Sequence, residues 1–334
     1  MQREGSPWQG LGTVVLKELG DHLGSARMRM LEWLMLLTAA APLYSAITSL
    51  RDTTAEDPFL LLKLFTVDRA PLPSFVGILG FLIPLMAIGL GFDAINGEHN
   101  RRTLSRILAQ PIYRDALLAG KFIAGLTTLG ISLLCLWLLV VGLGVLFLGV
   151  PPSWEEIARS LIFLFVSVAY AGVWLAVAML FSVIFRSPAT AALLSLGVWL
   201  FMTLLWPMIS PVLAQMIAPP DIRYVMLGLQ SPETLQWQVA LSRLSPNQLY
   251  GESVLAILSP STRALGPIFL DQLQGAVIGA ALPLKESLMI AWPQAVGLIA
   301  GAIMLFVATY VVFQRQEVRA WGIRGIFFTS PMKP

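Results

Sequence analysis

Six long apolar runs alternate with shorter polar segments along the chain. The runs cover residues 31–50, 72–95, 122–150, 160–185, 189–217 and 288–313. A helix that crosses the ~30 Å hydrocarbon core of a bilayer needs about 20 predominantly apolar residues, and each run is of that length or longer. Only Glu32 and Asp93 carry charge within the runs, each near a boundary. The pattern predicts an all-α integral membrane protein with six transmembrane helices.

Composition points to the same class. Of 334 residues, 57% are hydrophobic and 12% are charged, whereas a soluble domain averages about 45–50% apolar and roughly 25% charged residues. The net charge of +3 is too small and too dispersed to indicate a nucleic-acid partner. The single cysteine, Cys135, excludes a disulfide framework within one chain, and its apolar surroundings predict a small buried hydrophobe.

The distribution of charge predicts an orientation. Six spans place both termini on one side of the membrane, together with two internal loops. That side comprises residues 1–30, 96–121, 186–188 and 314–334. It carries 14 Lys and Arg in 80 residues, against 8 in 100 on the other side. Because Lys and Arg concentrate in cytoplasmic loops, we expect a cytoplasmic segment 1–30, a six-span domain 31–313 and a cytoplasmic tail 314–334.

The segment before the first span has helical periodicity. Apolar residues recur at spacings of three and four, at Trp8, Leu11, Val15, Leu19 and Leu23. Lys17, Glu18 and Asp21 lie between them. This pattern predicts an amphipathic helix that is too short and too polar to span. We expect it to lie along the cytoplasmic interface, with a plain soluble amphipathic helix as the alternative.

The loop between the second and third spans, residues 96–115, contains the signals of a short helix. Asn96-Gly97 predicts a turn. Asn100 is a suitable N-cap for the run that follows, and Pro111 ends that run.

This short helix has one apolar stripe and a basic surface. The stripe consists of Leu104, Ile107 and Leu108, and the other faces carry Arg101, Arg102 and Arg106. Such a helix either lies on lipid headgroups or docks in the groove of a partner protein. Periodicity alone leaves both interpretations open.

The segment before the last span, residues 218–287, is too long for a simple connector. Ser231-Pro232 and Ser245-Pro246 each have the pattern of a helix start. We therefore expect two or three short helices that lie at the outer interface or fold partly back into the bilayer. A small extracytoplasmic domain is the alternative.

The other sizeable outward segment, residues 51–71, carries four acidic residues and two prolines. Charged residues of this kind are mostly exposed to solvent. We expect this segment to be a solvated face.

Catalytic motifs are missing from the sequence. Gly120-Lys121 does not belong to a phosphate-binding loop, because Asp115 stands where that motif requires Gly. The two histidines, His22 and His99, have no cysteine partner and no spacing typical of a metal site. We therefore expect no enzyme activity and no bound metal or cofactor.

The last span contains a pair of glycines, Gly297 and Gly301, spaced as GxxxG. This spacing permits close helix contact. The contact would serve either dimerisation or packing within one chain.

The loop after the second span carries a set of residues in a recognisable order. They are Glu98, Thr103-Leu104, Leu108, Pro111, Arg114 and Gly120-Lys121. In these residues the chain resembles the six-span ABC-2-type permease subunits of ATP-binding-cassette transporters. Arg102 departs from the pattern, since the family usually has Gly there. Lys17-Glu18 resembles part of the family's interface helix, and the long segment before the last span suggests the branch that includes permeases linked to multicopper-enzyme maturation.

The resemblance implies a mechanical role. In the family, the loop after the second span is a coupling helix seated in a separate cytoplasmic ATP-binding subunit, which holds the ATP and Mg. The resemblance implies two copies of that subunit, a second identical or related permease chain, and export across a prokaryotic inner membrane. It also implies short re-entrant helices before the last span.

The coupling interface follows from the resemblance. It would comprise Glu98, Arg101, Arg102, Thr103, Leu104, Ile107, Leu108, Pro111 and Arg114. The leucines and the isoleucine would be buried anchors, because apolar anchors carry most binding energy. The charged residues would lie at the rim and set register and rate.

Three other functions compete with this one. An ion-coupled carrier or channel usually has ionisable residues inside its bundle, and the predicted third to sixth spans have none beyond Cys135 and tyrosines. A membrane-bound enzyme would need a catalytic constellation. Within the family, a permease-like subunit would transmit force to a periplasmic maturation partner. For the basic loop itself, contact with anionic membrane lipid is the alternative to a protein partner.

Overall fold

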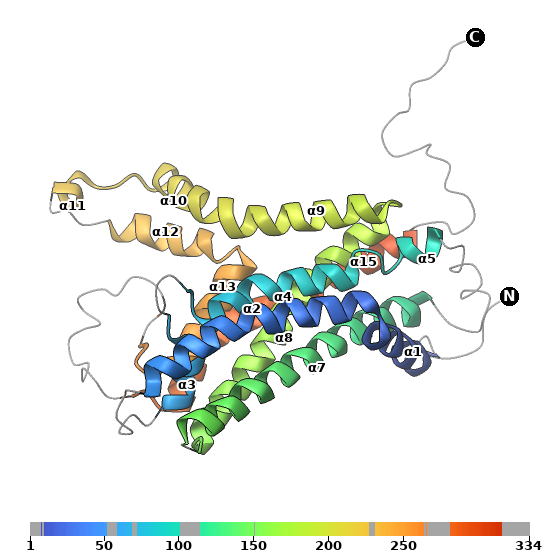
Figure 1. Cartoon of the computed structure of the whole chain (residues 1–334). Helices are drawn as coiled ribbons and strands as arrows, with labels where there is room; N and C mark the ends of the chain where they lie inside the picture. The colour runs from blue at the N-terminus through green and yellow to red at the C-terminus, as the bar shows by residue number, and fades with distance from the viewer. Residues whose placement is uncertain are drawn as a thin grey trace, which may run out of the picture.

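The computed structural model describes residue 8 and residues 10–51, 59–68, 72–100, 114–149, 151–226, 231–263, 265 and 281–315. The elements within these residues are helices. They form one elongated bundle (Figure 1).

Six helical segments are long and apolar enough to cross a membrane, which confirms the six-span prediction. Four are α2 (Ala26–Arg51), α7 (Arg114–Leu148), α8 (Trp154–Ile184) and α15 (Leu284–Arg315), and another runs from the start of α4 (Phe75–Gly91) to Asn100. The remaining segment joins α9 (Pro188–Leu200), a π-helical turn η1 (Phe201–Leu205) and α10 (Trp206–Ile217).

Short helices lie at both ends of the bundle. They are α1 (Leu11–Gly24), α3 (Leu60–Thr66), α5 (Asn96–Asn100), α11 (Ile222–Met226) and α12 (Pro232–Ser242). The short helix α13 (Pro246–Leu258) instead packs within the bundle. We call the end with α1 and α5 the terminal end. The start of α7 and the end of α15 also lie there (Figure 1). The opposite end, with α3, α11 and α12, is called the distal end.

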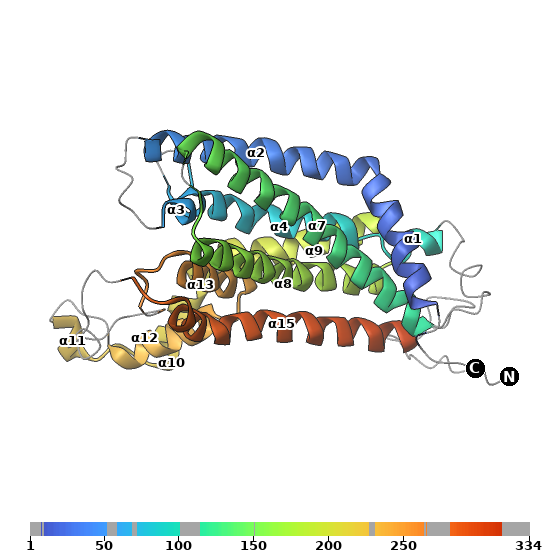
Figure 2. The ribbon, with the colours of Figure 1, turned by 90° about the horizontal axis from the view of Figure 1, so that it is seen from below.

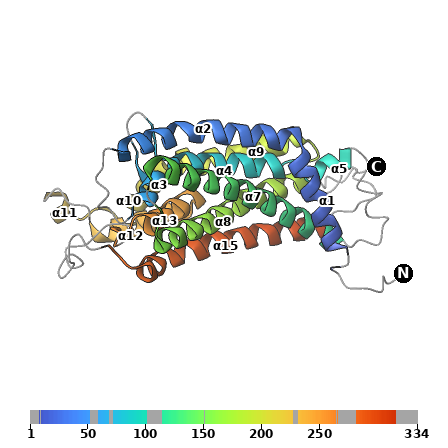
Figure 3. The same ribbon diagram turned by 60° about the horizontal axis from the view of Figure 1, so that its bottom comes forward.

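The core forms around α8, which lies between α7, α4 and α15 (Figure 3). Two thirds of the most apolar part of α8 is buried inside the chain, against 17% for Pro188–Ile217. Tyr170 in α8 is fully buried, and its ring stacks on that of Tyr250 with 4.4 Å between centroids. The α13 helix is therefore packed into the bundle against α8 and α15 rather than lying outside it.

Serine-proline pairs begin several of these helices, as predicted for α12 and α13. The Ser231 side chain accepts a hydrogen bond from the Thr234 amide and caps α12. Ser245 does not cap its own helix, and its hydroxyl instead donates to the Met202 carbonyl in the π-helical turn, over 3.0 Å. The start of α13 is thereby fixed to the middle of the preceding spanning segment.

The expectation of a solvated face over residues 51–71 is wrong for its second half. Residues 60–66 form α3, whose leucines and Phe65 are buried. The Glu156 carboxylate accepts a hydrogen bond from the Leu61 amide over 2.7 Å and so satisfies a free donor at the start of this helix. Burial of five apolar side chains in seven residues favours a packed helix more strongly than the neighbouring acidic residues favour exposure to solvent.

The expectation that Cys135 is buried is also wrong. Its side chain is exposed on the outer surface of α7. Within a membrane, an apolar outer face meets lipid, so an uncharged run does not distinguish core from surface.

Several spanning helices begin earlier than the apolar runs indicate, and the difference is largest for α7 and α8. The α7 helix begins at Arg114 instead of 122, and α8 begins at Trp154 instead of 160. The early turns contain charged residues, Lys121 and Arg159, that are both buried. Arg159 pairs with Glu155 one turn earlier and also donates to the carbonyls of Ile257 and Leu282, which are distant in sequence.

Candidate functional site

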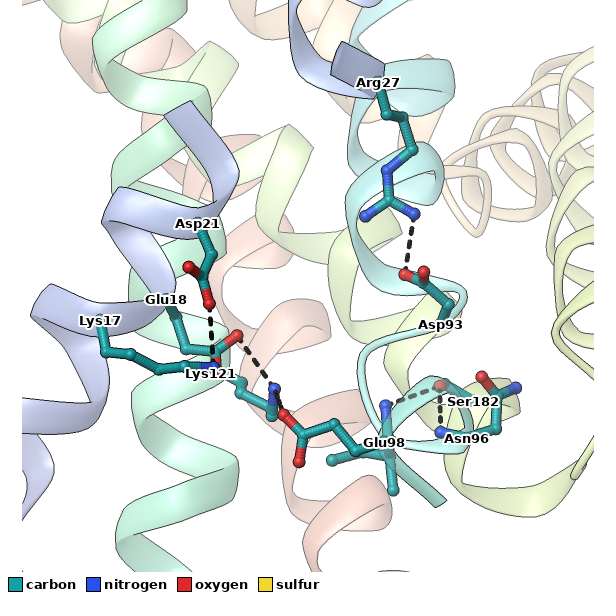
Figure 4. Close-up of polar contacts among 10 residues, drawn as sticks. Lys17, Glu18, Asp21, Arg27, Asp93, Asn96, Glu98, Lys121 and Ser182 are labelled. Atoms are coloured by element: carbon teal, nitrogen blue, oxygen red, sulfur yellow. Dashed lines mark hydrogen bonds and ion pairs between the residues drawn. The ribbon is translucent and has the colours of Figure 1, made fainter. Parts of the chain in front are cut away.

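A buried lysine joins three elements at the terminal end. The Lys121 ammonium, on α7, lies 2.9 Å from a Glu18 carboxylate oxygen of α1 and 2.6 Å from a Glu98 carboxylate oxygen of α5 (Figure 4). The three side chains are between 5% and 14% exposed. We call Lys121, Glu18 and Glu98 the terminal cluster.

Close contact between α1 and α7 buries the terminal cluster. A Cβ atom on Gly120 would lie 2.6 Å from a methyl carbon of Val14, so only glycine allows this approach. Val14 and Glu18 are one helical turn apart and are the buried residues of α1. The buried face thus combines an apolar residue with a carboxylate, whereas the apolar periodicity had placed Glu18 on the polar face.

Serine and asparagine side chains fix α5 to the end of α8. The Ile95 and Asn96 amides donate to the Ser182 hydroxyl over 3.0 and 3.3 Å (Figure 4). The Asn96 side chain donates to the Phe185 carbonyl over 3.1 Å. Residues 96–100 are therefore helical, and the predicted turn at Asn96-Gly97 is wrong, because the Ser182 hydroxyl supplies the acceptor that a helix start needs.

A second ion pair lies beside the terminal cluster. Arg27 of α2 contacts Asp93, just after α4, with 2.9 Å between nitrogen and oxygen. The guanidinium carbon also lies 5.2 Å from the centre of the Phe92 ring. Asp93 is therefore paired at the helix end, as expected for a residue near a membrane boundary.

The charges of this region fix the protonation states of α1. Burial of the Glu18 carboxyl opposes its ionisation, but the charges of Lys121 and Lys17 hold its pKa below the ordinary value. Burial likewise opposes the charge on Lys17, but hydrogen bonds to Glu18 and Asp21 raise its pKa. Glu18 is therefore a carboxylate and Lys17 is an ammonium group near neutral pH.

A cavity of about 570 Å³ adjoins the terminal cluster and is lined by residues of α1, α5, α7 and the start of α2. His22 lines this cavity, and its burial lowers its pKa from the ordinary value of 6.5. Lys121 and Arg27 lower it further, whereas Glu18 and Asp93 oppose the change.

The end of α15 is attached to the start of α7. The Arg114 side chain donates to the Phe313 carbonyl over 2.8 Å, and its guanidinium lies over the Phe313 ring at 4.9 Å. Gln314 also donates to Asp115. Arg114, one of the expected coupling residues, thus contacts α15 of its own chain.

The structure brings together only some of the expected site residues. Glu98 and Glu18 meet at Lys121 and Lys17 contacts Glu18, whereas Arg114 lies at the α15 contact. Seven expected coupling residues lie outside the described residues, namely Arg101, Arg102, Thr103, Leu104, Ile107, Leu108 and Pro111. The helix α5 ends directly before this segment, and α7 begins directly after it.

The two glycines of α15 differ in their surroundings. A Cβ on Gly297 would meet a Leu249 methyl carbon of α13 at 3.3 Å, whereas one on Gly301 would meet no described atom within 4 Å. Gly297 therefore packs within the chain. The two glycines do not share one contact among the described helices.

Sequence reasoning missed Ser182 and the role of Lys121. Lys121 was part of the family motif, but nothing local indicated that it would bind Glu18, which is over a hundred residues away. The only available signal was the one-turn spacing of Val14 and Glu18, which favours one buried face.

These contacts connect several helices at the terminal end. Ion pairs and hydrogen bonds connect α1, α5, α7 and α8, and the α7 start is further attached to α15. The terminal end thus joins these five helices through short, directional contacts.

Comparison with known proteins identifies the family. Residues 13–318 match the family described as ABC-2 family transporter protein. The chain is 28% identical over 258 residues to a probable ABC transporter permease protein NosY of Stutzerimonas stutzeri, which covers 75% of this chain and 82% of that protein. It is 31% identical over 192 residues to a protein of the same name from Pseudomonas aeruginosa, covering 56% of this chain and 63% of that protein. The chain belongs to the ABC-2 family of transporter permeases, integral membrane subunits whose family places the ATPase in a separate polypeptide.

Proposed function

We propose that this chain is the permease subunit of an ATP-driven exporter in which a cytoplasmic ATP-binding subunit binds at the terminal end. Two such subunits and a second permease chain complete the assembly. Residues 101–113 form the coupling segment that the ATP-binding subunit moves, with Leu104, Ile107 and Leu108 as its apolar anchors.

The observation that carries this proposal is the terminal cluster. Glu98 lies two residues before the end of α5, and Lys121 lies in the second turn of α7, so the cluster closes the base of the segment between them. A partner that pulled on this segment would therefore move α7 directly and α1 through Glu18. Without the Glu98–Lys121 contact, the same movement would change the backbone of the loop and would not be transmitted to α7.

Co-expression tests the proposal. The chain would be purified with an ATP-binding subunit encoded by an adjacent reading frame, and ATP turnover of the complex would be measured. Leu104→Asp with Leu108→Asp should release the ATP-binding subunit while the permease stays in the membrane. Met226→Asp serves as a control for charge on an exposed apolar side chain of α11, outside the spanning segments. Unchanged co-purification and turnover in the coupling variant would contradict the proposal.

Variants of the terminal cluster distinguish binding of the ATP-binding subunit from transmission of its movement to the spanning helices. Glu98→Gln should leave the ATP-binding subunit bound, because the anchors are intact, but should lower transport for each ATP hydrolysed. Inside-out vesicles report this ratio once a cargo is known. Until then, the coupling is read from the change in α7 hydrogen exchange on addition of ATP, which Glu98→Gln should reduce.

A second function within the family is favoured by the distal end. The helices α11 and α12 and the end of α10 extend beyond the other helices there (Figure 2). Trp206 donates to the Leu241 carbonyl over 2.8 Å and so links α10 to α12. A permease-like subunit that transmits force to a periplasmic maturation partner would use such an extension. Deletion of residues 220–230 that abolished enzyme maturation but left ATP turnover unchanged would favour this function.

A further inference from the structure

A continuous groove runs between α2 and α7 on the outer surface of the bundle. It consists of two adjoining cavities of about 370 and 270 Å³ that share Leu36, Leu136 and Leu139. Along α2 the lining extends from Arg29 to Ile47, which corresponds to about 27 Å at 1.5 Å per residue. Figure 2 shows α7 crossing α2 and leaving it toward the terminal end.

The groove has one polar end and a long apolar remainder. Arg29 and Glu32 lie at the end nearer α1, and the cavity at the other end is lined by aliphatic and aromatic side chains. Several side chains along it, including Trp33, Tyr44 and Phe147, are exposed on the outside of the chain. Since α2 and α7 are spanning helices, the groove opens to the bilayer along almost its full length.

The polar end carries one cation and one anion. Arg29 is exposed, lies in the first turn of α2 and forms no ion pair with any described residue. Glu32, one turn deeper, accepts a hydrogen bond from the Ser132 hydroxyl over 2.9 Å and has no cationic partner among those residues. Arg29 is placed to bind a phosphate at the headgroup level. The Glu32 carboxylate beside it would repel a purely anionic headgroup and attract an ammonium group.

We propose that this groove binds a zwitterionic aminophospholipid of the phosphatidylethanolamine type. Its phosphate contacts Arg29, its ammonium contacts Glu32, and one acyl chain lies in the apolar groove along α2 and α7. The proposal rests on membrane insertion and on these contacts, so it stands or falls independently of the proposed coupling to ATP.

Cys135 provides a built-in probe of occupancy. It is the single cysteine of the chain, it is exposed, and it lines the first cavity. The purified chain in detergent would be treated with a small maleimide, with added phosphatidylethanolamine or phosphatidylglycerol. Phosphatidylethanolamine should slow the reaction at least several-fold, and phosphatidylglycerol should have a much weaker effect. Native mass spectrometry should show one retained phosphatidylethanolamine per chain.

Matched variants identify the headgroup contacts. Arg29→Gln and Glu32→Gln should each reduce protection by phosphatidylethanolamine, and Glu32→Gln should also weaken the preference over phosphatidylglycerol. Arg223→Gln, an exposed arginine of α11, should change nothing. Ala40→Trp fills the second cavity and should lower lipid retention; if that variant does not fold, the two charge variants decide the test.

Two results would overturn the proposal. One is equal protection by both lipids that persists in the Arg29 and Glu32 variants. The other is protection of Cys135 that rises with protein concentration and is independent of added lipid, which would show that a second copy of the chain covers the groove.

Discussion

At the scale of single residues, Lys121 holds two carboxylates in a buried site. Lys121→Met would remove the buried cation that bridges Glu18 and Glu98, while the exposed Lys17 would remain beside Glu18. Removing one partner of a buried ion pair costs about 3–5 kcal/mol. We therefore expect the melting temperature of the detergent-purified variant to fall by several degrees, with α1 released before the bundle unfolds.

The matching control is Lys17→Met. Lys17 also contacts Glu18, but its side chain is 55% exposed, and exposed ion pairs contribute about 0–1 kcal/mol. Adding Glu18→Gln and Glu98→Gln to Lys121→Met should restore much of the lost stability, since the two side chains that Lys121 bridges are then neutral. Equal melting temperatures for Lys121→Met and Lys17→Met would show that the terminal cluster does not hold α1.

His22 gives the same region a pH dependence. Its pKa is below 6.5 in the folded chain because of burial, so the folded state favours the neutral imidazole. The contribution of neutral His22 to the free energy of unfolding is fully present above pH 6.5. It is lost as the pH falls through the lowered pKa. We expect the melting temperature to fall between pH 7 and pH 5, and His22→Gln to reduce that slope. Glu18 acts in a lower range, because its pKa is held below 4.5. An identical slope in His22→Gln would contradict this assignment.

At the scale of elements, α5 depends on its neighbours for its position. A helix of five residues is not stable in isolation, and Ser182 supplies the acceptor at its start. Ser182→Ala should cost about 1 kcal/mol and should accelerate hydrogen exchange of the amides at 95–100. Ser195→Ala is a suitable control, because this buried serine bonds only within α9. Unchanged exchange at 95–100 would show that the Asn96 contact suffices.

Hydrophobicity predicted the six spans because membrane insertion depends on a strong, local property of the chain. The starts of α7 and α8 were not predictable in the same way. Lys121 is compatible with buried helix because the distant Glu18 and Glu98 pair with it, and Arg159 because carbonyls of distant segments add to its local pair with Glu155. The site at the terminal end was predicted only in part for the same reason. Glu98 belongs to a family motif, whereas Ser182 contacts the start of α5 through tertiary structure alone.

At the scale of the whole molecule, the bundle has two chemically different ends. The terminal end gathers the ion pairs of α1, α5 and the start of α7, together with the end of α15. The distal end carries the extension formed by α10, α11 and α12 (Figure 2). An ATP-binding subunit must act from the cytoplasm, so the proposed function requires the terminal end to face that side. The excess of Lys and Arg on the terminal side, 14 in 80 residues against 8 in 100, predicts this orientation.

Cysteine accessibility decides the orientation. In a Cys135→Ser background, which removes the single native thiol, Asp21→Cys places a probe on the exposed part of α1 and Glu233→Cys places one on α12. A membrane-impermeant maleimide added to spheroplasts should label Glu233→Cys at once and Asp21→Cys only after permeabilisation. The difference follows from retention of basic loops in the cytoplasm. Labelling of Asp21→Cys from outside would place the terminal cluster on the wrong side for an ATP-driven partner, and the coupling role proposed for residues 101–113 would then have to be abandoned.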